Sequence, residues 1–356
     1  MKRVLISTGG SGGHVVPAIN FYNHLKTDFE VALYTDERGA KYIPKNINKR
    51  IFDVKKIPDK KILLPIKILF IFFAFIKSII HFRRTKFDII ISTGGYMSLP
   101  IVLAAKVFNK KIFLFEPNSI IGRSNKFLLI FSTKVFCYDK NLKGINKKYL
   151  NKIIEIPPIL NKCFYKDVKK NEDNDEVLKI LIIGGSQASL FFSKYLKNEI
   201  ISLSNKFKIE LTQQLSQGFD INKYKKEYNE NNIKNNLFFF EENLLCNNNF
   251  FDIAITRAGA SSIAELAHLN IPFISIPFPH ATDNHQLFNS QRYFDLNCCW
   301  ILEEKNFNSG DVTKIINKIM TNKIEYSEKK KNLKKISENN TWENINKKVL
   351  KYLNEN

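Results

Sequence analysis

The sequence predicts an α/β protein with two open parallel sheets, and three observations carry that prediction. The chain has 356 residues, which is long for one core and suits two domains of about 150 to 180 residues. Apolar runs typical of buried strands alternate with stretches typical of helices. An opening of strand, glycines and small polar residues, "RVLISTGGSGGH", recurs halfway along the chain as "LKILIIGGSQAS".

The first half contains six predicted strands. Each is a short run rich in apolar residues, as expected of strands that helices cover on both faces. The strands are expected at residues 3–7, 30–36, 87–93, 111–118, 134–138 and 153–158. Helices are expected from about Pro17 to Lys26 and over "LPIVLAAKVF" at 99–108. This alternation predicts βαβ units, and ligands of such sheets bind beyond the carboxyl ends of the strands.

A polar segment, "KDVKKNEDNDE" at residues 166–176, is interpreted as an exposed loop near the domain boundary. Its Asp173-Asn174-Asp175 matches the Asp-x-Asp that some sugar transferases use for metals, but an acidic loop is the favoured interpretation. The strand pattern then restarts, and the tail at 335–356 is predicted to be helical. Strands are expected within 178–189, 207–214, 236–243, 251–262 and 271–280.

The chain is strongly basic, with 55 Lys and Arg residues against 34 Asp and Glu and a net charge of +21. Such a charge suggests an anionic partner: nucleic acid, an anionic membrane surface or a phosphorylated ligand. The abundance of Lys, Asn, Ile and Phe also fits an AT-rich coding sequence, so charge alone ranks these partners weakly.

The five cysteines, Cys137, Cys163, Cys246, Cys298 and Cys299, are odd in number and lack CxxC spacing. We expect reduced thiols of a cytosolic protein, with neither a disulfide framework nor a zinc site.

Residues 60–84, "KKILLPIKILFIFFAFIKSIIHFRR", form the most apolar stretch of the chain. Its longest uncharged run, between Lys67 and Lys77, has nine residues, whereas a helix needs roughly 20 to span a bilayer. A buried helix is one interpretation. A helix lying in a membrane interface is slightly favoured, because phenylalanines are too dense for one buried face and cations bracket the stretch.

The first glycine loop places four glycines within residues 9–13, directly before His14. Glycines after a strand allow the backbone to approach a ligand, and the following helix presents free N–H groups to an anion. The dinucleotide fingerprint fails because Val15 occupies its last glycine position. His14 lies near the positive end of a helix, which favours a neutral ring that can accept a proton.

The second half carries three further motifs. Ser186 in "GGSQAS" is suited to donate to a phosphate. Glu265, about one turn into a helix that begins near Ser261, is suited to accept two hydrogen bonds from the hydroxyls of a ribose. The cluster "HATDNHQ" suits sugar hydroxyls, while a metal site there would need a geometry that sequence does not define.

Five segments, taken in order and spacing, resemble the MurG family of N-acetylglucosaminyltransferases. They are "GGSGGHVVPA", "STGGYMSLP", "FEPNSIIGRSNKFL", "GGSQAS" and "TRAGASSIAEL…PFPHATDNHQLFN". The resemblance covers essentially the whole chain.

The resemblance implies the GT-B architecture, with two Rossmann-like domains facing each other across a deep cleft. The expected domains are residues 1–160, which bind acceptor and membrane, and 161–339, which bind UDP-GlcNAc. A helix at 340–356 is expected to return to the first domain. The implied reaction moves GlcNAc from UDP-GlcNAc to the C4 hydroxyl of undecaprenyl-pyrophosphoryl-MurNAc-pentapeptide (lipid I), with inversion, in peptidoglycan synthesis. No metal and no cofactor are expected.

The resemblance also implies roles for individual residues. His14 matches the proposed general base. The acceptor-binding residues would be Ser11, Gly12, Gly13 and Tyr96. The donor-binding residues would be Asn118, Ser186, Glu241, Ala260, Glu265, His285 and Gln286. Residues 62–82 would dock on an anionic membrane, which implies a peripheral protein on the cytoplasmic face of the bacterial inner membrane.

Two positions depart from the family pattern. Leu160 replaces an arginine near the domain junction, so one donor-phosphate contact is missing unless Arg257 or Lys162 supplies it. Leu215 replaces a glycine in a turn.

Three other functions compete with the implied one. They are a GT-B transferase with another lipid acceptor, a dinucleotide-dependent reductase using Asp36, and a basic nucleic-acid-binding module. The last lacks any recognised binding motif, and no nucleic-acid partner is expected.

Overall fold

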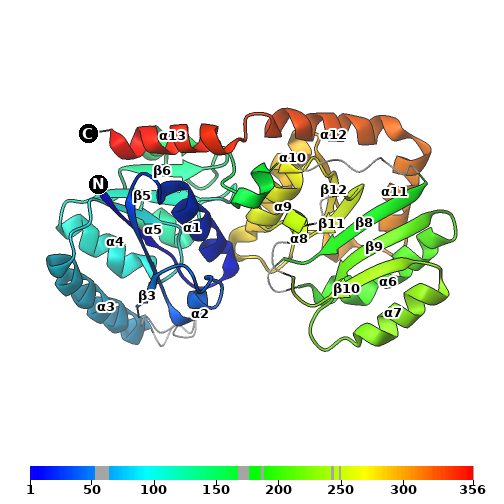
Figure 1. Ribbon diagram of the computed structural model, residues 1–356, viewed down its shortest axis with the longest axis horizontal. Helices are drawn as coiled ribbons and strands as arrows, with labels where there is room; N and C mark the ends of the chain where they lie inside the picture. The colour runs from blue at the N-terminus through cyan, green and yellow to red at the C-terminus, as the bar shows by residue number, and fades with distance from the viewer. Residues whose placement is uncertain (53–63, 167–175, 186–187, 242–243, 248–249, 356) are drawn as a thin grey trace. The chain divides into compact units, whose positions relative to one another are not determined.

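The computed structural model describes residues 1–52, 64–166, 176–185, 188–241, 244–247 and 250–355 (Figure 1). The chain divides into two compact units. Unit 1 comprises Met1–Lys162 and Thr341–Asn356, and unit 2 comprises Cys163–Asn340.

Unit 1 is built on a seven-stranded parallel sheet with the order β3-β2-β1-β4-β5-β6-β7. Its strands are β1 (Arg3–Ser7), β2 (Glu30–Thr35), β3 (Lys49–Ile51), β4 (Ile89–Ser92), β5 (Lys111–Glu116), β6 (Lys134–Cys137) and β7 (Ile153–Glu155). Its α-helices are α1 (Gly12–Leu25), α2 (Glu37–Ala40), α3 (Leu64–Arg84), α4 (Ser98–Val107), α5 (Arg123–Leu128) and α13 (Trp342–Asn354). The strand order reverses between β1 and β4, the point at which open α/β sheets bind ligands.

Unit 2 repeats this arrangement with six parallel strands in the order β10-β9-β8-β11-β12-β13. The strands are β8 (Val177–Ile183), β9 (Lys208–Gln214), β10 (Lys234–Phe238), β11 (Ile253–Thr256), β12 (Phe273–Ser275) and β13 (Cys299–Ile301). The α-helices are α6 (Leu190–Ser204), α7 (Ile221–Glu230), α8 (Leu244–Asn247), α9 (Ala260–His268), α10 (His285–Asp295), α11 (Asp311–Thr321) and α12 (Lys323–Ser337). Short 3-10 turns lie at Lys147–Lys152 (η2), Lys162–Tyr165 (η3), Thr282–Asn284 (η4) and Glu304–Asn306 (η5).

Strand β8 explains why a continuous apolar run marks the centre of each sheet. Ile180 and Ile182 belong to one core cluster of unit 2, while Leu181 and Ile183 belong to another. Successive side chains of a strand point to opposite faces, so both faces of β8 are buried. Its sequence therefore reads as a continuous apolar run and does not alternate between apolar and polar residues.

Helix α1 begins five residues before the predicted start at Pro17, at Gly12. The Ser11 carbonyl accepts hydrogen bonds from the N–H groups of His14 and Val15, which winds both glycines into the first turn. The prediction placed proline in the first turn, where it is commonest. The correction matters because it moves His14 from the approach to the helix into its first turn.

The predicted helix at 335–356 is also wrong in its extent. Helix α12 ends at Ser337, and α13 begins at Trp342 after a cap in which the Thr341 hydroxyl accepts from the Asn344 N–H. Within unit 1, α13 packs on α1, where the rings of Trp342 and His24 stack with centroids 3.5 Å apart. Burial lowers the pKa of His24 to about 4, so the ring is neutral in this contact.

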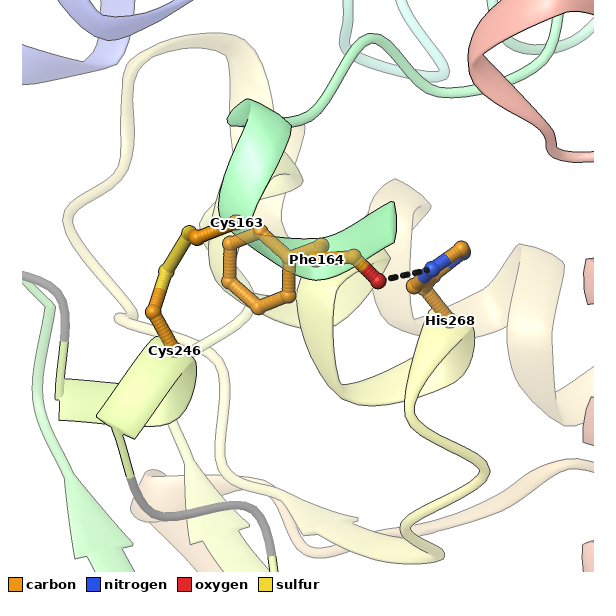
Figure 2. The surroundings of a disulfide bond; sticks show 4 residues. All are labelled: Cys163, Phe164, Cys246 and His268. Carbon is orange, nitrogen blue, oxygen red and sulfur yellow. Dashed lines mark hydrogen bonds between the residues drawn. A yellow bond between two sulfur atoms is a disulfide. The ribbon is translucent and has the colours of Figure 1, made fainter. Parts of the chain in front are cut away.

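The prediction that all five cysteines are reduced thiols is wrong for Cys163 and Cys246. These two are joined by a disulfide whose Cα atoms lie 5.6 Å apart, within the usual range for such bonds. Figure 2 shows the bond linking η3 to α8, beside Phe164, whose carbonyl accepts a hydrogen bond from the His268 ring. The partners are 83 residues apart in sequence, so spacing alone does not reveal the pair. Cys137, Cys298 and Cys299 are buried thiols, as predicted.

Reduction of this bond is expected to lower the melting temperature of the protein. Closing a loop of 83 residues stabilises the folded state by about 4.5 kcal/mol in the chain-entropy description. For a domain of this size, that corresponds to a shift of about 10 °C. Calorimetry with and without dithiothreitol measures the shift, after mass spectrometry has shown that the sample is oxidised. The double variant Cys163→Ala/Cys246→Ala is the control, and its melting temperature should not respond to reductant. An equal melting temperature for oxidised and reduced wild type would contradict the prediction.

Candidate active site

The glycine loop of unit 1 lies against a second glycine pair at the end of β4. Gly94 and Gly95 both have positive φ, +93° and +86°. A Cβ added at Gly95 would lie 2.6 Å from the Gly9 carbonyl oxygen, and one at Gly94 would lie 3.0 Å from His14 Nδ1. Larger residues therefore cannot occupy these positions without displacing the loop or the histidine.

His14 is held by this same segment. Its Nδ1 lies 2.9 Å from the Thr93 carbonyl oxygen, and the Thr93 hydroxyl donates to the His14 carbonyl at 3.0 Å. Because a carbonyl oxygen only accepts, Nδ1 must carry the proton of the neutral ring. The lone pair then lies on Nε2, and the half-buried ring is suited to accept a proton there.

The residues beside His14 form the start of α1. Ser11 is half-buried, Gly12 is buried and Gly13 is exposed. The first N–H groups of a helix have no partner within the helix, and the helix dipole favours an anion there. The arrangement fits the expected acceptor contacts, which remain a prediction.

Asp36 supports the loop from β2. Its Oδ1 accepts from the N–H groups of Gly10 and Gly39, and its Oδ2 accepts from the Arg38 side chain. Burial alone would raise the pKa of Asp36, but these hydrogen bonds outweigh it and hold the pKa below its ordinary value. The carboxylate is thus already engaged, which argues against the reductase alternative, in which Asp36 would bind a ribose.

Glu116 organises the loop that carries Asn118, and sequence reasoning missed it. Its Oε1 accepts from Asn118 Nδ2 at 2.8 Å. Its Oε2 accepts from the Gly122 N–H at 2.8 Å and from Asn125 Nδ2 at 2.9 Å. The only signal in the sequence is a glutamate that ends an apolar strand, and in the structure this residue is nearly fully buried. Asn118 is half-buried, with its amide oriented by Glu116.

Tyr96 follows the second glycine pair and packs partly buried against the core of unit 1. It therefore shares one edge of the sheet with the glycine loop, His14 and Asn118, since β1, β4 and β5 are neighbours. The structure thus brings together the expected residues of unit 1 at the carboxyl ends of three adjacent strands.

In unit 2, the loop after β8 begins at Gly184. A Cβ at Gly184 would lie 2.5 Å from the backbone of Ala188 and Ser189, so the loop folds back closely on itself. The Gly184 N–H donates to Gln214 Oε1 at 3.0 Å. Ser186 lies outside the described residues, and its expected phosphate contact remains a prediction.

Helix α9 begins at Ala260, after a cap at Gly259. It follows β11, the strand that lies next to β8 in the sheet. Glu265 lies in its second turn and keeps some solvent exposure. Burial by the surrounding protein nevertheless raises the pKa of Glu265 to about 7. Among the described residues, none donates a hydrogen bond to this carboxyl, which leaves both oxygens available to the hydroxyls of a ligand.

The turn after β12 orients Gln286 and His285 at the start of α10. Gln286 Oε1 accepts from the Phe278 N–H at 2.9 Å, and His285 Nδ1 lies 2.8 Å from the Thr282 carbonyl oxygen. Both residues are half-buried, whereas Glu241, after β10, is exposed. The loops carrying Ala260, Gln286 and the expected phosphate contact all follow neighbouring strands of one sheet.

Leu160 stands where the family pattern has an arginine, and Arg257 is not available to replace that arginine. Arg257 is 6% exposed, and its guanidinium forms an ion pair with Glu304 Oε2 at 2.5 Å. It also donates to the carbonyls of Ile276 and Pro277, and three phenylalanine rings surround it. Leu160 itself is buried in unit 1, and Lys162 is exposed with its Nζ 5.7 Å from the ring of Trp342.

Within the described part of the chain, no three His, Cys, Asp or Glu side chains gather closely enough to hold a metal ion. Asp173 and Asp175 lie outside the described residues. The expectation of a metal-free and cofactor-free reaction stays a prediction.

Comparison with known proteins defines the class first. Residues 4–137 match the glycosyltransferase family 28 N-terminal domain, and residues 179–345 match the family 28 C-terminal domain. The two parallel Rossmann-like sheets are those of a GT-B glycosyltransferase, so the predicted fold class is confirmed.

The relatives define the family within that class. The chain is 43% identical to the UDP-N-acetylglucosamine--N-acetylmuramyl-(pentapeptide) pyrophosphoryl-undecaprenol N-acetylglucosamine transferase of Pelagibacter ubique (strain HTCC1062), covering 100% of this chain and 99% of the relative. Identity to the Rickettsia canadensis (strain McKiel) protein of the same name is 32%, covering 91% and 92%. The crystal structure of Acinetobacter baumannii MurG matches with a TM-score of 0.77 at 21% identity, covering 99% of this chain and 100% of that chain. The chain belongs to the MurG family, as its motifs indicate.

Proposed function

We propose that this enzyme transfers GlcNAc from UDP-GlcNAc to the C4 hydroxyl of MurNAc in undecaprenyl-pyrophosphoryl-MurNAc-pentapeptide, the step from lipid I to lipid II. The observation that carries the proposal is the 43% identity over the whole chain to a curated transferase of that name. The geometry around His14 supports it, because the reaction needs a base for the attacking hydroxyl.

The chemistry divides between the two units. His14 Nε2 removes the proton of the acceptor C4 hydroxyl while that oxygen forms a bond to C1 of GlcNAc. The bond from C1 to the donor diphosphate breaks at the same time, and UDP leaves with the electron pair. The start of α9 and the loop after β8 stabilise the charge that develops on the diphosphate. Glu265 binds the ribose, and attack opposite the leaving group inverts the sugar.

A transfer assay with UDP-GlcNAc and a lipid I analogue tests this function. Formation of the disaccharide lipid, together with release of UDP, is the expected result. Transfer to another polyprenyl or glycolipid acceptor, with none to the lipid I analogue, would favour the alternative of a GT-B enzyme with a different acceptor.

Peripheral attachment to an anionic membrane through α3 is part of the proposal. One face of α3 packs on unit 1 through buried Ala74, Ser78 and Phe82. The opposite face exposes large apolar residues, and the cations Lys77, Arg83 and Arg84 are exposed in the C-terminal half of the helix. The exposed apolar residues are Ile66, Ile68, Leu69, Phe70, Phe72, Phe73, Ile76 and Ile80. Among the described helices, none is long and apolar enough to cross a bilayer.

The double variant Phe72→Asp/Phe73→Asp is expected to bind anionic liposomes at least about tenfold more weakly, since it removes two apolar anchors and adds two negative charges. Co-sedimentation with vesicles containing phosphatidylglycerol measures binding. Phe294→Asp is the matched control, because Phe294 is a similarly exposed phenylalanine on unit 2. Equal binding of the α3 variant and wild type would refute attachment through this face.

A further inference from the structure

The carboxylate that holds the glycine loop also holds a cation beside it. Asp36 accepts from the Gly10 N–H at 2.9 Å with Oδ1, and from Arg38 Nη2 at 2.7 Å and Nε at 3.2 Å with Oδ2. The Asp36 side chain is only 5% exposed, whereas that of Arg38 is 42% exposed. One buried group therefore fixes both the backbone of the loop and the position of a half-exposed guanidinium.

Arg38 lies directly alongside the loop. A Cβ built on Gly10 would lie 3.7 Å from Arg38 Nη2, so the guanidinium would be in van der Waals contact with any side chain at this position of the loop. A guanidinium has five N–H donors. Asp36 engages two of them, which leaves three N–H groups on a charged, partly exposed and already oriented side chain.

We propose that Arg38 binds the diphosphate of the lipid acceptor, as a second contact next to the first turn of α1. The inference rests on the proposed function and on the expected acceptor contacts of Ser11, Gly12 and Gly13, which would set that diphosphate against the glycine loop. A planar guanidinium matches phosphate oxygens with paired N–H groups, and an arginine already oriented loses less conformational freedom on binding than a free one.

A solvated surface ion pair is the competing explanation of the Arg38–Asp36 contact. Exposed pairs contribute little and need no buried partner, whereas this carboxylate is buried and is already satisfied on one oxygen by two backbone N–H groups. Composition points the same way. Only eight of the 55 basic residues are arginine. Drift toward a basic surface has therefore supplied mainly lysine in this chain, and it does not explain an arginine at position 38.

The test measures the KM of a short-chain, water-soluble lipid I analogue, which makes the result independent of membrane attachment. Arg38→Ala is expected to raise that KM about 10- to 100-fold, with the KM for UDP-GlcNAc unchanged. Arg38→Lys, which keeps the charge and loses the paired donors, should lie between Arg38→Ala and wild type. Lys41→Ala, at an exposed cation three residues away, is the matched control for general electrostatic attraction and should resemble wild type.

Inorganic pyrophosphate provides a readout that does not depend on transfer. Its affinity for the wild-type protein, measured by calorimetry, should fall about tenfold or more in Arg38→Ala while the melting temperature and UDP affinity stay the same. Unchanged acceptor KM in Arg38→Ala would overturn the inference, as would an unchanged pyrophosphate affinity. If wild type fails to transfer to the analogue, the proposed function fails, and the assignment to an acceptor diphosphate fails with it. A loss of pyrophosphate binding in Arg38→Ala would then show an anion site of another purpose.

Discussion

Replacing His14 by alanine is expected to lower kcat for GlcNAc transfer by about a hundredfold to ten-thousandfold, the range that a positioned general base contributes. The ring is oriented by the Thr93 carbonyl, and its Nε2 is the only nitrogen left to accept the proton of the acceptor. Affinity for UDP should remain close to that of wild type, because the expected donor contacts other than Asn118 lie in unit 2. Steady-state kinetics with a lipid I analogue and calorimetry with UDP check the two halves of this prediction.

Two further variants sharpen the His14 experiment. His14→Gln retains a side chain that can hydrogen-bond but cannot act as a base near neutral pH, and it should be as slow as His14→Ala. Asn23→Ala changes another polar residue of the same helix and should turn over normally. Near-wild-type turnover of His14→Ala would remove His14 from the mechanism.

Replacing Glu265 by alanine is expected to weaken UDP binding by at least about tenfold, since hydrogen bonds to a charged acceptor contribute about 1.5–3 kcal/mol each. No described residue donates to this carboxyl, so a ribose diol would be its first partner. Calorimetric titration with UDP measures the loss. Glu328→Ala, at an exposed glutamate on α12, is the control. An unchanged UDP affinity in Glu265→Ala would refute the ribose role.

The affinity for UDP-GlcNAc should also depend on pH through Glu265. Burial raises the pKa of this carboxyl to about 7 from the ordinary 4.5, so a large share of the free protein carries it neutral at neutral pH. Ribose hydroxyls donate to the ionised form, so binding favours loss of the proton and becomes tighter as pH rises. Between pH 6 and 8 the affinity should increase about tenfold, following the ionised fraction.

UDP-GlcNAc is the ligand for this titration, because the terminal phosphate of UDP itself takes up a proton near pH 6. Glu265→Gln has no carboxyl to titrate, and its affinity should be flat over the same range. A flat profile for wild type would show that the carboxyl does not change its ionisation when donor binds.

The sequence predicted the strands that are buried on both faces well. It predicted the strands at the edges of the two sheets much less well. β1, β4, β5 and β8 are apolar on both faces, and their positions were predicted to within a few residues. β3 and β13 have three residues each and were not predicted. The equally short edge strand β7 was recognisable from its apolar Ile153 and Ile154, whereas two of the three residues of β3 are charged. The start of α1 was misplaced because two glycines, poor helix formers, occupy its first turn.

The candidate site shows the same division. His14, Glu265 and the glycine loops were identified because special residue types stand in a recognisable order. Glu116 and Asp36 were missed as supports, since their roles depend on backbone N–H groups that sequence does not position. The interpretation of Arg257 as a spare cation failed for a related reason. The charge of Arg257 was evident from the sequence, but its partly buried ion-pair partner, Glu304, was not.

Helix α13 has a consequence for the order in which the protein can fold. Its buried residues Ile345, Val349 and Leu353 complete unit 1, yet they follow the whole of unit 2 in the chain. A ribosome adds about 5–20 residues per second, so the 163–340 stretch delays α13 by roughly 10 to 35 s after the rest of unit 1 has emerged. During that interval the surface of α1 that receives Trp342 is uncovered, although all strands of the unit 1 sheet have been synthesised. We expect nascent-chain chaperones to bind this uncovered apolar surface.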